Sequence, residues 1–570
     1  MRKSQLIPIS PWRLPLMAIV ISLLFCLLLW KLLSLQVMNS DRGSEFLRDQ
    51  GEARYLRNAV IPAYRGLISD RRGEPLAVSA PVVSLWADPA RLAASERVAE
   101  LAVLIDLSES QLREKLERYA NKRFMYLQRR MSPERARPVL DAKFPGVGSD
   151  REYRRYYPAG EVAAHVVGLT NIDGKGIEGL ELSYDQHLAS QSGRKQVIKD
   201  RHGNVVRDVG ELRAPVFGRD LTLSIDLRLQ YLAHRELHTA IKLTGARAGS
   251  VVTMDSRTGE VLALANFPFY NPNNLRGVEP GQRRNRALID AFEPGSTMKP
   301  VAVAAALHSG KFSPQTLIDT APGRIQVGRK VLHDPVNYGE IDLARVVVKS
   351  SQVGMVKVAL ALDAQAVWQM YRGFGFGVHP GTGFPGESSG VLPYREKWRP
   401  IERATLAYGH GLTATPLQLA QAYSVFANAG RRVSPSLLRL EPEDVVSERV
   451  LSRPLAAQML EILEGVTADI GTGKRARVAG YRVGGKTGTA HKASAGGYSD
   501  NRYLALFVGV APISDPRLVT VVLLDEPAGD RYHGGEVAAP VFSRVMAGAL
   551  RLLNIVPDQI THQIAAAEAV

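Results

Sequence analysis

Ser296 and Lys299 are the two residues whose types and spacing most clearly suggest chemistry. They lie in the segment AFEPGSTMKPVAVAAAL, directly after Pro294-Gly295 and at the expected start of an apolar helix. A spacing of three residues places both side chains on one face of that helix. A serine hydroxyl becomes a nucleophile when a neighbouring base removes its proton, and a lysine with a lowered pKa can be that base. Free N–H groups at the helix start would stabilise an oxyanion, so the pair predicts acyl transfer.

Two further segments contain residues that suit the same chemistry. In KSSQVGMVKVA, Ser350 and Gln352 stand beside an apolar run. The segment VGGKTGTAHK is strand-like and flanked by glycines, and its candidate residues are Lys486, Thr487, Gly488 and Thr489. In this order the three segments resemble the Ser-x-x-Lys, Ser-x-Asn and Lys-Thr-Gly motifs of penicillin-recognising serine enzymes. Three motifs in order are far more specific than any one of them.

Two other matches to these short patterns are interpreted as chance. Ser192 and Lys195 form a second Ser-x-x-Lys, but they lie in a basic connector, SGRKQVIKDRHGNVVRD, where no helix is expected to present them. A literal Ser-Asp-Asn at Ser499 to Asn501 follows the Lys-Thr-Gly segment and is predicted to lie in a loop. Neither is expected to take part in catalysis.

The N-terminal part of the sequence predicts a membrane anchor. Residues 14–37 are almost entirely apolar, and about 24 residues of helix cross a hydrocarbon core of roughly 30 Å. Arg2, Lys3 and Arg13 precede this stretch, which favours a cytoplasmic N-terminus and an extracytoplasmic catalytic part. A cleaved signal peptide is the alternative, but the following QVMNSDRG has no Ala-x-Ala-like cleavage site.

The rest of the chain must position the three motifs, and its pattern changes along its length. Gly/Pro turns and short β-branched runs up to about residue 90 predict small hairpins, and residues 92–140 have helical spacing. A strand pattern passes into a helix pattern at about Asp226, which marks the expected start of the main domain. From there four strand-like segments (GSVVTMD, GEVLALAN, LALFVGVAP and LVTVVLLDEP) alternate with long Ala/Leu helices. The predicted fold class is multi-domain α/β, with an antiparallel sheet flanked by helices in the last domain.

Composition narrows the possible classes of protein. A chain of 570 residues should form about two to four domains, and 45% hydrophobic with 22% charged residues excludes a disordered or polytopic membrane protein. The net charge of +16 suits an anionic partner, but charge alone leaves nucleic acid, lipid and cell-wall polymer open. No nucleic-acid-binding fold is evident, which favours a solvated basic surface. Because Cys26 is the single cysteine, an intramolecular disulfide and a cysteine-rich metal site are excluded.

Longer segments resemble the class B penicillin-binding proteins. VIPAYRGLISDRRGEPLAVS and RRYYPAGEVAAHVVGLTNIDGKGIEGLELSYD are similar to their pedestal segments, and YGHGLTATPLQLAQAYSVFANAG and YHGGEVAAPVF are similar to parts of their transpeptidase domain. The Ser-Ser-x-Val-Gly form of the second motif is closest to the division-specific branch, or to a specialised paralogue of it. The resemblance implies a cytoplasmic tail (1–13), a transmembrane helix (14–37), a pedestal or dimerisation-like domain (38–215), a transpeptidase domain (216–557) and a C-terminal tail (558–570).

The resemblance also implies a role for each candidate residue. Ser296 would attack the penultimate D-Ala carbonyl of a peptidoglycan stem peptide, with Lys299 as the base. Ser350 and Lys486 would move a proton to and from the leaving amine. The backbone N–H groups of Ser296 and Thr489 would form the oxyanion hole. The substrate itself would be held by Gln352, Thr487, Gly488 and Thr489.

The resemblance implies partners and a location as well. The implied partners are stem peptides, β-lactams bound covalently at Ser296, a SEDS-type glycosyltransferase and other division proteins. The implied location is the cell inner membrane, which the chain would cross once, with the catalytic domain in the periplasm. No nucleic acid, cofactor or metal is expected.

Gln352 departs from the family pattern, which usually has Asn there. The longer stem would misplace the amide, and about 1 Å of misplacement can cost about a hundredfold in rate. Two alternatives stay open: a catalytically weakened scaffold or β-lactam sensor of the division complex, and a β-lactamase. No Glu-x-x-x-Asn segment of the class A β-lactamase kind lies between Gln352 and Lys486, which argues against the latter.

Overall fold

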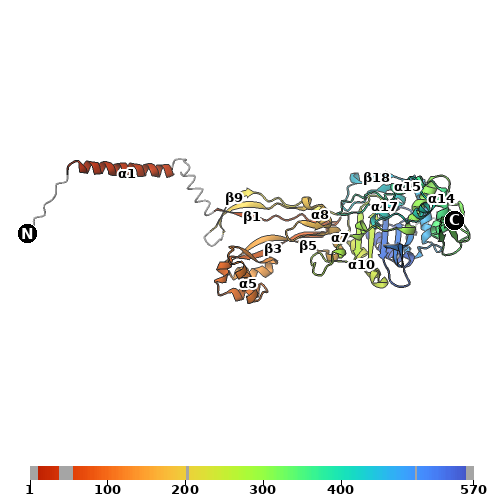
Figure 1. Ribbon diagram of the computed structural model, residues 1–570, viewed down its shortest axis with the longest axis horizontal. Coiled ribbons are helices and arrows are strands. Elements are labelled where there is room, and N and C mark those ends of the chain that lie inside the picture. Colours follow the sequence, from red (N-terminus) through yellow and green to blue (C-terminus); the bar gives the residue numbers. More distant parts are fainter. Residues whose placement is uncertain (1–9, 37–55, 200–204, 495–496, 560–570) are drawn as a thin grey trace, which may run out of the picture. The chain divides into compact units, whose positions relative to one another are not determined.

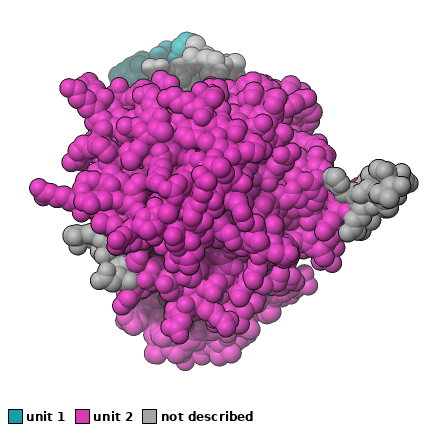
Figure 2. All heavy atoms as spheres, turned by 90° about the vertical axis from the view of Figure 1, so that its right-hand side faces the viewer, with its two compact units in different colours: residues 1–63, 190–217 teal, residues 64–189, 218–570 magenta. Residues whose placement is uncertain are grey.

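A computed structural model describes residues 10–36, 56–199, 205–494 and 497–559 of the chain (Figure 1). The chain forms two compact units, one from residues 1–63 and 190–217 and the other from residues 64–189 and 218–570 (Figure 2). The chain therefore leaves the first unit and later returns to it. The predicted domain boundaries follow a different division and stay a prediction.

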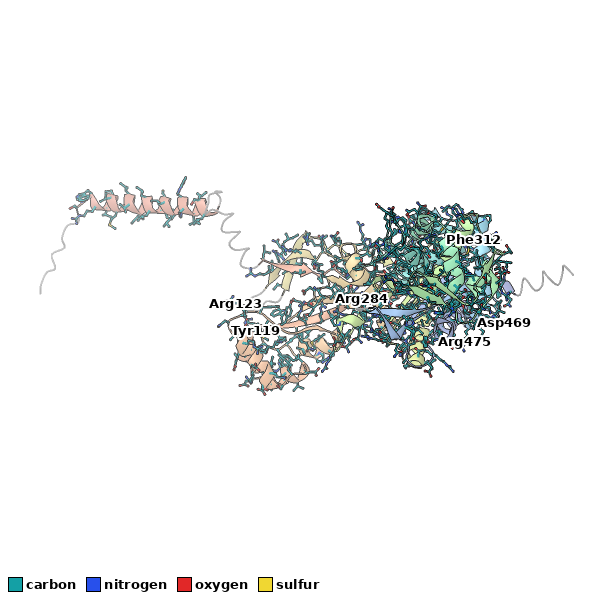
Figure 3. All side chains as sticks on the ribbon, turned by 45° about the vertical axis from the view of Figure 1, so that its right-hand side comes forward. Tyr119, Arg123, Arg284, Phe312, Asp469 and Arg475 are labelled. Carbon is teal, nitrogen blue, oxygen red and sulfur yellow. The ribbon has the colours of Figure 1, made fainter. Side chains whose placement is uncertain are left out.

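Helix α1 (Arg13–Gln36) belongs to the first unit and agrees with the predicted anchor. Its 24 residues rise about 36 Å, enough for the roughly 30 Å hydrocarbon core of a bilayer. Its apolar side chains project on all sides of the helix (Figure 3), and none of its most apolar stretch is buried among the described residues. An 18-residue stretch within residues 13–35 has a mean hydropathy of 2.6, so this helix is long and apolar enough to cross a membrane. Val37, the last residue of the predicted span, lies outside the described residues.

The first unit also contains an antiparallel sheet of three strands, in the order β1-β8-β9. The strands are β1 (Leu56–Ile61), β8 (Gly193–Lys199) and β9 (Val205–Arg213). The prediction of a basic connector over residues 192–208 was therefore wrong for residues 193–199 and 205–208, which are strand. Strand β8 pairs with β1, more than a hundred residues earlier in the chain, so no local turn signal could indicate the pairing.

The second unit begins with a sheet in the order β10-β2-β3-β4, in which β5 also pairs with β3. Its strands are β2 (Ile68–Ser69), β3 (Pro75–Ala87), β4 (Met125–Met131), β5 (Val147–Tyr156) and β10 (Leu221–Thr222). Of the small hairpins predicted here, β2–β3 is present, turning at Gly73. Strand β3 is a long central strand rather than part of a second hairpin, because β4 and β5 pair with it from later in the chain.

A small helical layer packs on this sheet, as predicted for residues 92–140, although β4 interrupts it. Its helices are α3 (Pro89–Ala93), α4 (Val98–Leu104), α5 (Glu109–Arg118) and α6 (Pro133–Asp141). Leu101, Leu112 and Val139 pack with Leu85 of β3 in a core of their own.

Short elements follow that layer, around a buried ion cluster. They are η1 (Gly160–Val162), α7 (Ala164–Val167), β6 (Leu169–Thr170), β7 (Gly176–Glu178), α8 (Gly179–Ser183) and α9 (Asp185–Leu188). The Glu181 carboxylate is fully buried and accepts hydrogen bonds from Nε of Arg65 and of Arg155, both at 2.6 Å. This cluster ties the chain before β2 to β5 and α8.

The largest sheet has five antiparallel strands in the order β12-β11-β21-β20-β19. They are β11 (Ala248–Asp255), β12 (Val261–Phe267), β19 (Gly484–Ser494), β20 (Gly497–Ala511) and β21 (Leu518–Asp525). Alternate side chains enter different cores: Phe507 packs with α10 (Leu227–Thr244) and α19 (Gly534–Leu552), whereas Val508 packs with the helices on the other face. Asp226 accepts a hydrogen bond from Arg228 N and caps α10, which confirms the predicted change of pattern there.

The second face of this sheet supports a helical region that contains the candidate site (Figure 1). Its helices are α11 (Arg286–Ile289), α12 (Lys299–His308), α13 (Leu343–Val348), α14 (Gln352–Ala361), α15 (Ala364–Gly373), α16 (Pro400–Ala407), α17 (Pro416–Ala427) and α18 (Arg453–Thr467). Short strand pairs are β13 (Leu317–Asp319) with β16 (Glu340–Asp342), β14 (Arg324–Val327) with β15 (Lys330–His333), and β17 (Arg431–Val433) with β18 (Ser447–Arg449). Single 3₁₀ turns are η2 (Pro280–Gln282), η3 (Gly295–Met298), η4 (Pro442–Asp444) and η5 (Lys474–Ala476). Among these helices, α12, α17 and α18 correspond to the long Ala/Leu helices predicted from the sequence.

Candidate active site

Ser296 lies in η3, a 3₁₀ turn that leads directly into α12. The turn starts at Gly295, whose φ of +57° is accessible to glycine with little strain. Gly295 N donates a hydrogen bond to the carbonyl of Gly409 at 3.1 Å, and a side chain on Gly409 would meet the Gly295 carbonyl oxygen at 2.1 Å. The serine turn therefore packs closely against the YGHG loop where Gly295 and Gly409 meet. Ser296 itself stays partly exposed at the surface of this arrangement.

Lys299, Ser350 and Lys486 meet in one hydrogen-bonded cluster. Lys299 Nζ donates to the Ser350 carbonyl oxygen and, at 3.1 Å, to Ser350 Oγ. Lys486 Nζ donates to the same Ser350 Oγ at 2.9 Å. The hydrogen bonds of Lys299 in the described part of the chain go to Ser350 rather than to Ser296. The predicted residues thus converge, with the Ser350 hydroxyl as the bridge between two lysines.

Burial changes the acidity of both lysines. Lys299 is 2% exposed and Lys486 is fully buried. Loss of hydration lowers the pKa of Lys299 to about 7, although the charge of Asp334 opposes the shift. The pKa of Lys486 falls well below its ordinary value, because of burial and then because of the charge of Lys299. A neutral amine at Lys299 is thus accessible near neutral pH, as a general base requires.

Asp334 organises the second motif and was not predicted from the sequence. It follows β15 directly and is almost fully buried. Its carboxylate accepts hydrogen bonds from Ser351 Oγ at 2.5 Å, from Gln352 N, and from Val353 N at 3.1 Å. The Ser351 hydroxyl in turn caps α14 by accepting from Gly354 N at 2.9 Å. These bonds hold the start of α14 next to Ser350.

The backbone of Ser350 is strained. Its φ is +59°, in the left-handed region that non-glycine residues rarely adopt. Such a conformation costs on the order of 1–3 kcal/mol and persists where surrounding contacts hold it. Here Ser350 N donates to the Val347 carbonyl at 3.1 Å, and Ser351 is anchored by Asp334. The strain orients the Ser350 side chain toward both lysines.

Strand β19 brings the third motif alongside the serine turn. A side chain added to Gly488 would meet Thr297 Cγ2 at 2.9 Å and the Pro294 carbonyl oxygen at 3.2 Å, so the strand approaches the turn at backbone distance. The Thr487 and Thr472 hydroxyls are 3.0 Å apart. Thr489 Oγ1 accepts a hydrogen bond from Gly534 N, at the start of α19, at 3.1 Å.

Gln352 is partly exposed at the first position of α14. Its side chain lies near the hydroxyl of Tyr408. Burial raises the pKa of this hydroxyl, and the neighbouring Gln352 amide lowers it. The Gln352 amide is thus near Tyr408, which directly precedes the YGHG glycine that contacts the serine turn.

Two family models match the chain. The model of the penicillin-binding protein transpeptidase domain matches residues 249–547, more than half of the chain, and that of the penicillin-binding protein dimerisation domain matches residues 60–223. This chain belongs to the penicillin-binding proteins. Its site lies inside the transpeptidase match, and the dimerisation match covers residues 60–215 of the predicted pedestal.

Curated relatives agree with that assignment. The Pseudomonas aeruginosa protein named probable peptidoglycan D,D-transpeptidase PbpC is 43% identical over 92% of this chain and 93% of its own length. The Escherichia coli peptidoglycan D,D-transpeptidase FtsI is 41% identical over 96% of this chain and 93% of its own length. Each alignment covers more than nine tenths of both chains, which agrees with the predicted resemblance to class B penicillin-binding proteins.

Solved structures agree as well. The transpeptidase domain of penicillin-binding protein 3 from Burkholderia pseudomallei is 39% identical, with a TM-score of 0.55 over 59% of this chain and 97% of that one. Penicillin-binding protein 3 from Mycobacterium tuberculosis, solved with aztreonam, is 30% identical, with a TM-score of 0.67 over 88% of this chain and 98% of that one. The predicted fold class is thereby confirmed.

The two short-pattern matches that were interpreted as chance lie on elements other than those of the three motifs. Lys195 lies on β8 in the first unit, where it forms an ion pair with Asp208 at 2.8 Å. The prediction of a loop at Ser499 to Asn501 was wrong, because the backbone of these residues belongs to β20. That strand continues past the sheet core as a hairpin with β19, and a polar composition alone did not indicate it.

The histidines near the site occupy its edges. His410 Nδ1 lies 3.0 Å from Glu293 Oε2, three residues before Ser296. The ring of His491 contacts that of Tyr503 at 4.7 Å, and His533 directly precedes α19. Glu293 and Asp334 are the residues near the motifs that sequence reasoning missed, since neither stands in a recognisable pattern.

Proposed function

We propose that this penicillin-binding protein is a peptidoglycan D,D-transpeptidase that cross-links stem peptides during septal wall synthesis through an acyl-enzyme on Ser296. The observation that carries the proposal is the cluster of Lys299, Ser350 and Lys486 beside the serine turn. It supplies a base with a pKa of about 7 and a hydroxyl bridge to a second amine. Similarity to named D,D-transpeptidases supports the reaction class.

In the acylation step, the neutral amine of Lys299 takes the proton of the Ser296 hydroxyl as Oγ bonds to the penultimate D-Ala carbonyl carbon. Backbone N–H groups of Ser296 and Thr489 receive the oxyanion. The C–N bond then breaks, and the departing D-Ala amine receives a proton through Ser350 from Lys486 or Lys299. The products of this step are an ester on Ser296 and free D-Ala.

In the second step, the amine of a neighbouring stem peptide attacks the ester carbonyl. The cluster accepts the proton of that amine, and Ser296 Oγ leaves as an alcohol after regaining a proton. The new bond is the peptide cross-link. The same serine, base and relay thus serve both halves of the reaction.

Substrate contacts come from β19 and α14. The Thr487 and Thr489 hydroxyls hold the terminal carboxylate of the donor, and Gly488 between them lets β19 approach the serine turn. Gln352 contacts the acyl amide, and the neighbouring Tyr408 limits how far the Gln352 amide reaches. β-Lactams resemble the D-Ala-D-Ala end, so they acylate Ser296 and remain bound.

The anchor and the pedestal support the proposed location and the proposed partners. Helix α1 crosses the inner membrane once and leaves the catalytic domain in the periplasm, consistent with the cations before it. A SEDS-type glycosyltransferase and other division proteins contact the transmembrane helix and pedestal. The basic surface then faces the anionic cell wall and lipid.

Time-resolved labelling of the full chain in detergent with a fluorescent penicillin tests this function. Stable label that depends on Ser296, lost in Ser296→Ala, is the expected result, and Gln352→Asn should label faster. Absence of label on a folded protein would instead favour the scaffold or sensor, for which the engaged Gln352 amide is the motivating observation. Label that disappears within seconds would favour a β-lactamase.

A further inference from the structure

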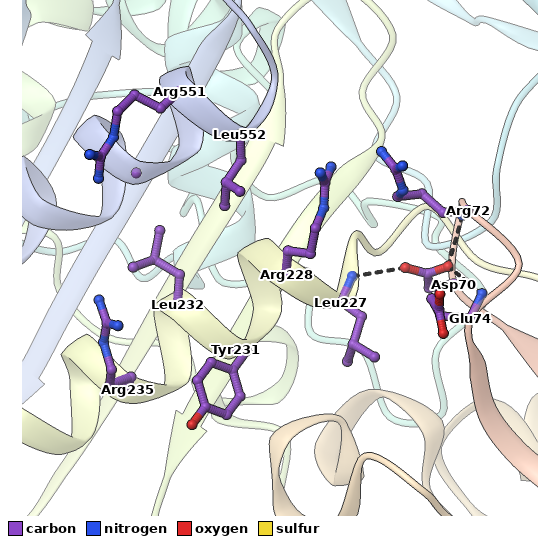
Figure 4. A pocket seen from close by; sticks show the side chains of 11 residues that line it. Asp70, Arg72, Glu74, Leu227, Arg228, Tyr231, Leu232, Arg235, Arg551 and Leu552 are labelled. Carbon is purple, nitrogen blue, oxygen red and sulfur yellow. Dashed lines mark hydrogen bonds between the residues drawn. The ribbon is translucent and has the colours of Figure 1, made fainter.

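A pocket of about 800 Å³ lies away from the candidate active site (Figure 4). One wall is the turn between β2 and β3 in the pedestal, and the other walls are the start of α10 and the end of α19. None of the three motifs contributes to it. Its lining residues are Asp70, Arg72, Glu74, Leu227, Arg228, Tyr231, Leu232, Arg235, Gly548, Arg551 and Leu552.

The floor of the pocket is apolar. The side chains of Leu232 and Leu552 point toward each other across it, with Leu227 near the pedestal turn (Figure 4). Gly548 allows the helices to approach closely, since a Cβ there would lie 2.4 Å from Leu232 Cδ2. Tyr231 is 58% exposed, which is unusual for so large a side chain and leaves its ring available to a partner. The floor thus offers space for side chains of leucine size.

The pocket presents guanidinium groups to solvent. Arg228 is bound to Asp226 at 2.6 Å, and Arg235 is bound to Glu236 at 2.8 Å. The exposed side chains of Arg72 and Arg551 make no hydrogen bond or ion pair with other described residues. Two cationic groups therefore stand beside an apolar floor with their donors directed to water.

The carboxylates of the pocket do not cancel this charge at its surface. Asp70 is fully buried, and its oxygens accept hydrogen bonds from Arg72 N and Glu74 N at 2.8 Å and from Leu227 N at 3.0 Å. This carboxylate is committed to the backbone of the turn and of α10. Among the lining carboxylates, Glu74 is the exposed one.

We propose that this pocket binds an acidic peptide segment of another protein, one that carries leucine-type side chains between its carboxylates. The apolar side chains fill the floor, and carboxylates pair with the unoccupied guanidinium groups of Arg72 and Arg551, to which their geometry is complementary. Because the pocket joins the pedestal turn to two transpeptidase helices, a bound segment fastens these parts together. The proposal does not depend on the chemistry at Ser296.

A peptide titration on the full chain in detergent tests it. The probe is a fluorescein-labelled helical peptide with leucines at helical spacing among glutamates. Its controls replace every glutamate by lysine or every leucine by serine. The pocket variant is Arg72→Glu with Arg551→Glu, and the matched control is Arg123→Glu (Figure 3) with Arg276→Glu, exposed arginines outside the pocket. Both double variants change the net charge equally.

We expect the glutamate–leucine peptide to bind more tightly than either control peptide. The pocket variant should weaken it by about tenfold, the matched control by less than about twofold. Tyr231→Ala should also weaken binding without changing any charge. Equal weakening in both double variants, or equal binding of the three peptides, would overturn the proposal. Penicillin labelling of the variants at the wild-type rate would show that they are folded. If the wild type itself were not labelled, that result would count against the proposed role of Ser296 and not against the peptide-binding pocket.

Discussion

The ionisation of Lys299 gives the acylation step a defined dependence on pH. Its pKa falls from 10.5 to about 7, which corresponds to a free-energy cost of about 5 kcal/mol for the charged form. Since the base is the neutral amine, the rate should rise with pH and level off above about 7. From the fraction of neutral amine, the acylation rate constant at pH 8 should be about tenfold higher than at pH 6.

Asp334→Asn separates this ionisation from general damage. The negative charge of Asp334 raises the pKa of Lys299, so removing it should move the midpoint of the profile to lower pH. The asparagine keeps one oxygen that accepts hydrogen bonds from the backbone N–H groups of Gln352 and Val353, but its hydrogen bond with Ser351 is weaker. The free energy of unfolding should therefore fall by about 1–2 kcal/mol. A matched change, Asp363→Asn at the exposed cap of α15, should leave the midpoint unchanged.

The assay is stopped-flow acylation of the full chain by a chromogenic cephalosporin between pH 5.5 and 8.5. Lys299→Arg, which cannot become neutral in this range, should lose at least about a thousandfold in rate. A flat profile for the wild type would refute the role of Lys299 as base. A midpoint that rises in Asp334→Asn would refute the electrostatic argument, because a lost anion cannot favour a nearby cation.

Three other changes have defined outcomes. Gly488→Ala should slow acylation by about tenfold or more with little change in melting temperature, because the new methyl group presses on Thr297; an unchanged rate would contradict the close approach of β19. Glu181→Ala should cost about 3–5 kcal/mol in chemical denaturation, since it leaves the buried Arg155 guanidinium without its carboxylate and removes one of the two carboxylates paired with Arg65, and a loss below about 1 kcal/mol would contradict this. Tyr408→Phe should alter the acylation rate of the wild type more than that of Gln352→Asn, and equal effects in both would argue against an interaction between Tyr408 and Gln352.

The sequence predicted the parts of the site that lie in local patterns. Ser296 with Lys299 and the Lys486 strand were recognisable because a few adjacent residues carry each signal, and the strands of the large sheet are long apolar runs. The start of α10 was visible because Asp226 caps it. Such signals need no knowledge of what packs against them.

Other features depend on contacts between distant parts of the chain. Asp334 stands in a polar turn with no motif, and only the fold brings it to the start of α14. The pairing of β8 with β1 likewise joins segments far apart, so its charged sequence resembled a connector. Ser350 bridges two lysines because its backbone takes a left-handed conformation, which no residue type at that position would indicate.

The covalent role of Ser296 is the claim on which the account depends most. Intact-mass measurement of the full chain after incubation with benzylpenicillin, followed by peptide mapping, tests it directly. The account predicts one added penicillin per chain, located on the peptide that contains Ser296, and no adduct on Ser296→Ala. An adduct mapped to another residue, or one that persists in Ser296→Ala, would contradict it.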